Sequence, residues 1–274
     1  MLVDLHVHTS FTPGCKLDPT LALEKAEGVG LDGICFTDRN TWKGAAALHR
    51  LREQTDLAIF VGAEITTDHG HYLVFFPRPE EVPEPAEMFG APGDGERWPV
   101  RKVIETVRER GGVAIAAHPY DRNLERPAGD FIFTLRGLAA IEGFAGTRKN
   151  NVNELAIEAA DHLSLPCVGG SAAEGSYQEI GTAATLFRDP IRDEAALVAA
   201  LRAGSVWAVA IGTPPKFVGD ELALREREER RDERRDDRRG GYGGERRGGR
   251  DDRRGGGGHR RRGGRGGRGG GGRR

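Results

Sequence analysis

The sequence has little cysteine and no long apolar run, and both shortages narrow the class of protein. Its 274 residues include three cysteines, Cys15, Cys35 and Cys167, without the C-x-x-C spacing of zinc or redox motifs. No stretch reaches the roughly 18 apolar residues that a membrane span needs, and no basic segment followed by an apolar run opens the chain. We therefore expect a cytoplasmic protein in a reducing compartment, with no membrane partner.

The net charge of −1 conceals two parts of opposite sign. Residues 221–274 hold 20 Arg against 11 Asp and Glu, a net of +9, which leaves −10 for residues 1–220. Apolar residues are almost absent after Leu224, so this end of the chain cannot bury a core. We expect a folded domain over residues 1–212, a charged linker or isolated helix over 213–239, and a disordered Arg/Gly-rich tail over 240–274.

Short apolar runs alternate with longer amphipathic segments, which is typical of βα units around a mostly parallel sheet. Seven runs are expected to form strands: Leu2–Val7, Gly33–Thr37, Leu57–Val61, Val113–Ala117, Ala139–Phe144, Leu165–Gly169 and Ser205–Ile211. Five segments are expected to form helices: Pro19–Glu27, Gly44–Glu53, Val100–Arg110, Asn151–Leu163 and Glu194–Ala203. This alternation favours a barrel over an open sheet. The proline-rich segment Pro77–Pro99 is expected to be a loop outside the core.

Side chains that bind divalent metals come at the ends of several expected strands. His6 and His8 are two residues apart, so both point to the same side of the first strand. Asp38, Glu64 and His118 directly follow three further apolar runs. Because the carboxyl ends of barrel strands meet at one face, the set predicts a metal centre there. Taken by themselves, His6 and His8 could also be two polar residues at the end of a strand that bind no metal.

The order of these motifs resembles that of the PHP (polymerase and histidinol phosphatase) family of metal-dependent phosphoesterases. Its DLHxHT, FTDH, GxE, AHP and GSDAH motifs correspond here to Asp4-Leu5-His6-Val7-His8-Thr9, Phe36-Thr37-Asp38-Arg39, Gly62-Ala63-Glu64, Ala117-His118-Pro119 and Gly170-Ser171-Ala172-Ala173-Glu174. The resemblance extends over about residues 1–211. It implies an α/β fold, a distorted (β/α)7 barrel, and a centre of up to three zinc, manganese or iron ions that hydrolyses phosphate esters.

The resemblance also implies a role for each ligand. His6 and His8 would bind a first ion, Glu64 would bridge it to a second ion, and the second ion would be completed by His71 and His118. His71 on its own could be either a ligand or a hydrogen-bonding partner. Asp38 would be a further ligand or a base beside the metals.

Four positions depart from the family pattern, and they change the expected metal count. Arg39 stands at a histidine position, Ala172 at an aspartate position and Glu174 at a histidine position, and Pro13 lies near another expected ligand. Because guanidinium and proline cannot ligate a cation, we expect one or two ions and no third. Two hypotheses follow: Glu174 replaces the lost ligand of the first ion, and Arg39 contacts the substrate phosphate or pairs with Glu174.

The Arg/Gly-rich end of the chain resembles the RGG segments of RNA-binding proteins. Arginine neutralises phosphates and stacks on bases, and glycine lets the backbone conform, so we expect binding of RNA or another polyanion. A solvated tail, or one that binds the acidic domain of the same chain, is the alternative. The arginines expected to contact nucleic acid are Arg246, Arg247, Arg250, Arg260, Arg261, Arg262, Arg265 and Arg268.

Together these features predict a metal-dependent phosphoesterase. Its substrate would be a nucleotide, a small phosphorylated metabolite or a nucleic-acid end. The alternative is a barrel that is catalytically weak or inactive because some of the family's metal ligands are missing. Such a barrel would act as a scaffold and bind RNA through the tail. Metal content and turnover discriminate between the two.

Overall fold

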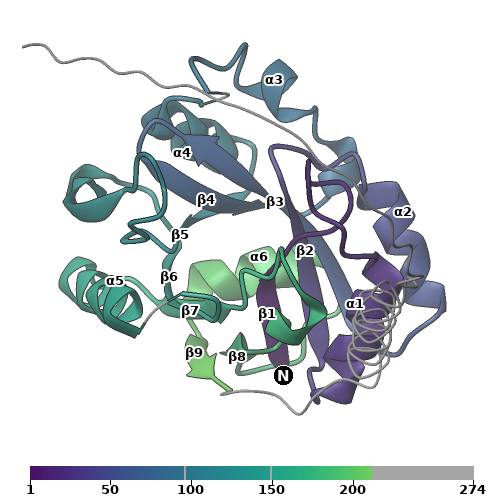
Figure 1. Ribbon diagram of the computed structural model, residues 1–274. Coiled ribbons are helices and arrows are strands. Elements are labelled where there is room, and N and C mark those ends of the chain that lie inside the picture. Colours follow the sequence, from purple (N-terminus) through teal and green to yellow (C-terminus); the bar gives the residue numbers. More distant parts are fainter. Residues whose placement is uncertain (96, 149, 212–274) are drawn as a thin grey trace, which may run out of the picture. The chain divides into compact units, whose positions relative to one another are not determined.

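Nine strands form one sheet that curves into a nearly closed barrel (Figure 1), so the expected distorted α/β barrel is confirmed. The computed structural model describes residues 1–95, 97–148 and 150–211, and the predicted linker and Arg/Gly tail lie outside them. The strands are β1 (Leu2–Val7), β2 (Gly33–Arg39), β3 (Ala58–Thr67), β4 (Gly70–Phe75), β5 (Val113–Ala117), β6 (Ala140–Ala145), β7 (Cys167–Gly170), β8 (Ala183–Phe187) and β9 (Val206–Ala210).

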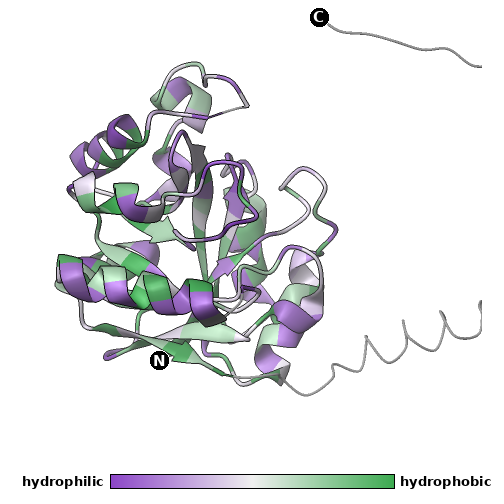
Figure 2. Cartoon of the chain, turned by 60° about the vertical axis from the view of Figure 1, so that its left-hand side comes forward, coloured by the Kyte–Doolittle hydropathy of each residue, from purple (hydrophilic) through white to green (hydrophobic). Residues whose placement is uncertain are grey.

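Helices lie between several of the strands (Figure 1), and apolar and polar residues both occur along each of them (Figure 2). The α-helices are α1 (Pro19–Gly28), α2 (Ala45–Arg50), α3 (Pro85–Met88), α4 (Val100–Glu109), α5 (Asn150–Leu163) and α6 (Glu194–Ala203). Their ends follow from local sequence: Asp193 caps the start of α6 by accepting a hydrogen bond from the backbone N–H of Ala196, and Gly204 ends it in the left-handed conformation. In the part of the chain that the structure describes, no helix is long and apolar enough to cross a membrane.

The barrel is distorted because two of its nine strands, β4 and β8, run antiparallel to their neighbours. The sheet order is β7-β6-β5-β4-β3-β2-β1-β8-β9. Strand β4 forms a hairpin with β3 and also pairs antiparallel with β5, and β8 pairs antiparallel with β1 and β9. The sequence pattern of seven runs omitted both strands. The β3–β4 turn is only two residues long, so it does not separate two apolar runs clearly. Strand β8 is only five residues long, which is too short to stand out in the sequence.

The barrel closes where the chain leaves β7 and meets the end of β1. The backbone N–H of His8 donates to the carbonyl of Ala173 at 2.9 Å, and that of Ser171 donates to Asp4 Oδ1 at 2.8 Å. A Cβ atom added to Gly170 would lie 2.6 Å from the Cβ of His6. Only glycine therefore allows this close approach of β7 to the strand that carries the two histidines.

The segment Pro77–Pro99 contributes to the core, so the expectation of a loop outside the core was wrong. It contains α3 and a single 3-10 turn, and it buries Phe89 and Trp98, whose rings meet edge to face with centroids 6.0 Å apart. The Trp98 ring nitrogen donates to the carbonyl of Gly90 at 2.8 Å. The prolines shape the backbone, but the large aromatic side chains between them still pack inward.

A buried carboxylate joins α6 to α2 and β3 away from the strand ends. Glu194 Oε1 accepts hydrogen bonds from His49 Nε2 at 2.7 Å, Arg52 Nη2 at 2.6 Å and the backbone N–H of Val61 at 3.2 Å. Burial by itself raises the pKa of Glu194, but His49 and Arg52 outweigh it and hold that pKa below its usual value. Glu194 is therefore ionised in the folded state.

Replacing Glu194 with glutamine is expected to lower the free energy of unfolding by about 3 kcal/mol, because it leaves Arg52 without its charged partner. Since the folded pKa is depressed, the stabilisation is present above the ordinary glutamate pKa of 4.5 and is lost as pH falls through the folded value. Urea unfolding of both proteins at several pH values measures this difference. The exposed Glu158→Gln variant serves as control, and a gap between wild type and Glu194→Gln that stays constant below pH 4.5 contradicts the model.

Candidate metal centre

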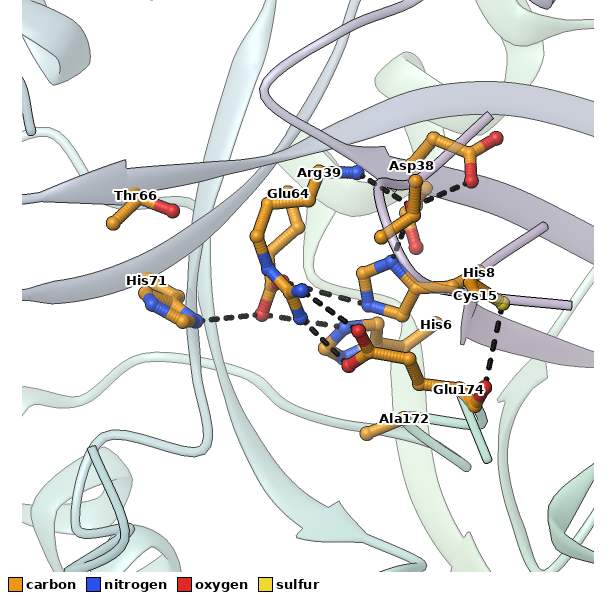
Figure 3. Close-up of polar contacts among 12 residues, drawn as sticks. His6, His8, Cys15, Asp38, Arg39, Glu64, Thr66, His71, Ala172 and Glu174 are labelled. Carbon is orange, nitrogen blue, oxygen red and sulfur yellow. Dashed lines mark hydrogen bonds and ion pairs between the residues drawn. The ribbon is translucent and has the colours of Figure 1, made fainter. Parts of the chain in front are cut away.

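Five of the predicted ligands meet at one end of the barrel, and Figure 3 labels four of them. His6 and His8 come from the end of β1, Glu64 from β3, His71 from β4, and His118 directly follows β5. Among the described residues, three groups place one ligand atom of each member within 4.8 Å of the others: His6, His8 and Glu64; Glu64, His71 and His118; and His6, His118 and Glu142. Two of the three groups share Glu64, and they are the two sets that the sequence assigned to a first and a second ion.

Glu64 is the hub of this cluster and is completely buried. Its Oε1 lies 3.0 Å from His71 Nδ1, 3.1 Å from His118 Nε2 and 3.5 Å from His6 Nε2. Its Oε2 lies 3.4 Å from His8 Nε2. One carboxylate oxygen therefore faces His6, His71 and His118 and the other faces His8, so Glu64 contacts the histidines of both ligand sets, as a bridging ligand requires.

These donor separations fit a divalent ion. Ligands about 2.0–2.1 Å from a tetrahedral zinc lie about 3.3 Å from one another, and the separations around Glu64 span 3.0 to 3.5 Å. His6 Nε2 is buried without a hydrogen-bond partner. A buried, unsatisfied nitrogen aimed at a carboxylate is costly unless a further partner binds it. The residues present therefore fit one or two divalent cations, held by imidazole nitrogens and carboxylate oxygens.

Two residues that the sequence analysis did not assign to the site orient the histidines of β1. Glu142, on β6, accepts from His6 Nδ1 at 2.9 Å and from the backbone N–H of His118 at 2.9 Å. Thr12 lies 3.0 Å from His8 Nδ1 through its hydroxyl. These contacts leave the Nε2 atoms facing Glu64, and hydrogen bonds to the other ring nitrogen are what fix the orientation of imidazole ligands in metal sites. The sequence singles out Glu142 only as a charged residue inside an apolar run. No sequence pattern singles out Thr12.

The protonation of the cluster suits metal binding. Burial raises the pKa of Glu64, but His71, His118 and His6 outweigh it, so the carboxylate has a pKa well below its usual range. Burial lowers the pKa of His8 to about 3 and also lowers that of His118, so both imidazoles are neutral. His6 differs because Glu142 outweighs its burial and raises its pKa to about 10. At neutral pH this imidazole therefore carries a proton on each nitrogen, and a cation would have to displace the one on Nε2 while Glu142 retains the one on Nδ1.

Asp38 lies beside the ligand cluster but its oxygens are occupied by a loop. Its Oδ1 accepts from the backbone N–H of Thr9 and the hydroxyl of Thr12, both at 2.7 Å, and its Oδ2 accepts from the hydroxyl of Thr9 at 2.7 Å. Burial raises the pKa of Asp38, and these hydrogen bonds oppose that rise. Asp38 belongs to none of the three ligand groups found among the described residues. Its contacts hold in place the loop that follows His8.

Arg39 and Glu174 form an ion pair at the mouth of the cluster. The guanidinium donates to both oxygens of Glu174, each at 2.8 Å, and its Nε donates to Glu64 Oε2 at 3.1 Å (Figure 3). The Arg39 side chain is 27% exposed and that of Glu174 is 38% exposed. The structure thus brings the two departing residues together, with a fixed positive charge against the outer oxygen of the bridging carboxylate.

The backbone around the cluster adopts conformations that most side chains avoid. Four non-glycine residues in the described part of the chain have positive φ, and Asn40 (56°), His118 (27°) and Ala172 (53°) lie at the ends of the strands that carry the site. Such conformations cost about 1–3 kcal/mol each and collect where a fold must aim particular groups. At His118 the unusual turn directs the imidazole back toward Glu64.

A polar cavity of about 440 Å³ opens beside the cluster. Its lining includes Arg39, His71 and Glu174 from the metal centre and, from later loops, Asp121 and Arg148, whose Nε lies 2.6 Å from Asp121 Oδ2. No aromatic side chain lines it among the described residues, so it offers charges and hydrogen-bonding groups and no stacking surface. A small, anionic and strongly hydrated group fits such a cavity best.

Comparisons with known proteins agree with this architecture. Residues 150–206 match the PHP-associated family model. The structure superposes on that of a protein from Bifidobacterium adolescentis assigned as a metal-dependent phosphoesterase, with a TM-score of 0.56, 19% identity, and coverage of 73% of this chain and 95% of that one. The chain has a PHP-type fold. The family model covers α5, β7, β8 and α6 and ends at the first residue of β9, so it leaves outside the candidate ligands on β1, β3 and β4.

Further matches place this PHP-type protein among diverse relatives. It is similar to the lesion-specific endonuclease Q of Pyrococcus furiosus, with a TM-score of 0.54, 14% identity, and coverage of 76% of this chain and 57% of that one. In sequence it is 29% identical to the uncharacterized protein MJ1587 of Methanocaldococcus jannaschii over 168 residues, which is 57% of this chain and 90% of the relative. The structural likenesses are too distant in sequence to carry more than the fold.

Proposed function

We propose that this PHP-type protein hydrolyses a phosphate ester with two divalent ions. One observation carries the proposal: Glu64 presents one oxygen to His6 and His118 and the other to His8, in a buried cluster whose donor spacing suits metal ions. The related folds of a metal-dependent phosphoesterase and of endonuclease Q, which was solved with a duplex carrying an abasic lesion, support the same class of reaction. The ions would be zinc, manganese or iron, as imidazole and carboxylate ligands allow.

When bound, paired divalent ions lower the pKa of water and neutralise charge on a phosphoryl group. The residues of this chain hold and orient the components. His6, His8 and Glu64 hold the first ion, and Glu64, His71 and His118 hold the second. Glu142 and Thr12 keep the imidazoles of β1 aimed inward, and Asp38 fixes the loop that contains Thr12. The roles of Asp38 as ligand or base and of Glu174 as ligand remain predictions.

Arg39 is proposed to bind a phosphate oxygen of the substrate. Its guanidinium lines the polar cavity and touches Glu64, so an anion in the cavity would lie within reach of both the ions and Arg39. A carboxylate and a phosphate offer similar paired oxygens to a guanidinium fork. The substrate phosphate would therefore displace Glu174 from Arg39. The freed carboxylate would then be able to move to the first ion. The polar lining favours the phosphate and sugar of a nucleotide or a nucleic-acid end, or a small phosphorylated metabolite.

Metal content and turnover test the proposal directly. Protein stripped with a chelator and reloaded with zinc, manganese or iron is expected to bind up to two ions per chain, measured by mass spectrometry of the metals, and to hydrolyse members of a phosphate-ester panel. The His6→Ala variant is expected to lose both properties while keeping its circular dichroism spectrum. Bound metal without His6-dependent turnover would favour the scaffold, and a folded protein that binds no metal would overturn the proposal.

RNA binding by the tail remains a separate prediction. The eight arginines expected to contact nucleic acid lie outside the described residues. The structural alignments cover 73% and 76% of the whole chain, and the support that the neighbouring folds give concerns the barrel alone. The composition of residues 240–274 is the only support, and the tail does not contribute to the argument for the metal centre.

A further inference from the structure

A second charged surface lies on the outside of the barrel, along α4 and the chain that follows it. Two cavities meet there and share Arg108, one of about 260 Å³ that also includes Arg101 and Arg136, and one of about 710 Å³ that also includes Arg202. Arg101 and Arg108 are seven residues apart on α4, so they lie on the same side two turns apart, about 10 Å along the axis. We call the surface of these four residues the arginine groove.

Three of the four guanidinium groups, those of Arg101, Arg136 and Arg202, are held in place by backbone and hydroxyl oxygens. Arg101 donates to the carbonyl and hydroxyl of Thr134 at 3.0 and 2.9 Å, and Arg202 donates to the carbonyl of Gly112 at 3.1 Å. Arg136 donates to the carbonyls of Phe133 and Leu135 at 3.1 and 2.8 Å. The groups therefore follow one short stretch of chain and the start of β5, instead of extending separately into solvent.

The loop between Leu135 and Leu138 lies against the fourth cation, Arg108. A Cβ atom on Gly137 would lie 3.4 Å from Arg108 Nη1, so the guanidinium of Arg108 rests on this glycine. Arg101 is further fixed by Phe131, whose ring centroid is 5.5 Å from its guanidinium carbon. Fixed orientation lowers the entropy that these side chains lose when they bind a ligand.

These cations lack carboxylate partners in the described part of the chain. Arg39, Arg52, Arg78, Arg97 and Arg148 each lie within 4.0 Å of an Asp or Glu oxygen, whereas none of the four arginines of the groove does. The smaller cavity has one acidic residue in its lining, Glu105, and the larger cavity has none.

The local charge also contrasts with that of the rest of the domain. Residues 97–148 carry nine Arg or Lys against six Asp or Glu, although residues 1–220 have a net charge of −10. Four oriented and unpaired cations on an acidic domain form a local positive potential that attracts an extended anion. No carboxylate of residues 1–95, 97–148 and 150–211 pairs with them, so they are available to an external anion.

We propose that the arginine groove binds the phosphodiester backbone of a nucleic-acid strand. Guanidinium groups bind phosphates through two parallel hydrogen bonds, and several of them in a row match a chain of phosphates better than a single small anion. The described lining of both cavities has no aromatic residue, so bases would not stack there and binding would be independent of sequence.

The groove is distinct from the metal centre. Its larger cavity is lined by residues that precede β5, β6 and β7, namely Gly112, Ala139 and Pro166, and so it opens at the amino ends of the strands. The metal ligands lie at the carboxyl ends of β1, β3 and β5. A strand bound in the groove would therefore contact the protein without entering the metal centre, and the proposal does not depend on hydrolysis.

Salt-dependent binding of a labelled oligothymidylate to the full-length protein tests the groove. The variant Arg101→Gln/Arg108→Gln/Arg136→Gln is compared with Arg50→Gln/Arg78→Gln/Arg188→Gln, which removes the same charge from exposed positions elsewhere. The tail is present in both, so its contribution cancels. Fluorescence anisotropy is expected to show at least about tenfold weaker binding for the groove variant at low salt, and a slope of log Kd against log salt reduced by about 2.

The single variant Arg108→Gln, whose guanidinium makes no hydrogen bond to the described residues, should reduce the slope by about 0.7. Equal affinity and slope for the groove and control variants would overturn the proposal. Competition by polyglutamate that is as strong as competition by oligothymidylate would assign the groove to acidic polypeptides and would also overturn it. Unchanged metal-dependent hydrolysis of a small phosphate ester in the groove variant shows that the metal centre is intact, which separates this test from that of the proposed function.

Discussion

Replacing Glu64 with glutamine is expected to remove both metal ions together and to reduce phosphate-ester hydrolysis to background. The change is nearly isosteric, but it replaces a charged oxygen with an amide nitrogen that cannot ligate a cation. Because Oε1 faces His71 and His118 while Oε2 faces His8, a single substitution acts on both ligand groups. We expect metal affinity to fall more than about 100-fold at both sites, beyond the loss typical of residues that only orient ligands.

Isothermal titration of chelator-treated protein with zinc and with manganese measures this loss. Glu142→Gln is the matched control, since Glu142 is equally buried and contacts His6 and the backbone of His118, yet only orients the ligands in the proposed centre. It is expected to weaken metal binding by about 10- to 100-fold. Retention of one tightly bound ion in Glu64→Gln would show that the two groups are independent and that Glu64 does not bridge them.

Replacing Arg39 with alanine is expected to lower kcat/KM by about 100- to 1000-fold, the range seen when a preorganised group that stabilises transition-state charge is removed. Glu174→Gln should act in the opposite direction on anion binding. It leaves the guanidinium free of its bidentate partner, so inorganic phosphate should inhibit this variant more strongly than the wild type. Initial rates with increasing phosphate measure both effects.

A further variant, Glu174→Ala, distinguishes two roles of Glu174. If Glu174 only neutralises Arg39, bound metal is unchanged in Glu174→Ala. If it replaces the ligand missing at Ala172, the first ion is lost. Full activity in Arg39→Ala would show that Arg39 does not contact the substrate, and its ion pair would then be structural.

The sequence could predict that the candidate ligands lie close together, because two simple geometric rules govern their positions. Residues two apart on a strand share a side, which placed His6 with His8, and parallel strands of a barrel end at one face, which placed Glu64 and His118 beside them. Both rules are local or follow from fold class. The pairing of Arg39 with Glu174 was one of two stated alternatives, and the structure shows that contact.

Other parts of the site depended on contacts that no local pattern encodes. Glu142 reaches His6 across 136 positions of sequence, and its role required knowing that β6 lies beside β5 and close to β1. The hydroxyls of Thr9 and Thr12 converge on Asp38 only after the loop has folded. The antiparallel strand β4 was missed for a related reason: its hairpin supplies His71, but the apolar run alone did not reveal its direction.

The left-handed backbone at Ala172 has a consequence for the missing oxygen ligand. At φ 53° an alanine gains nothing from the conformation, whereas aspartate and asparagine are enriched there among non-glycine residues. The polypeptide thus keeps a shape suited to the aspartate that the PHP motif carries at this point. Restoring that side chain would therefore require no change in the course of the main chain.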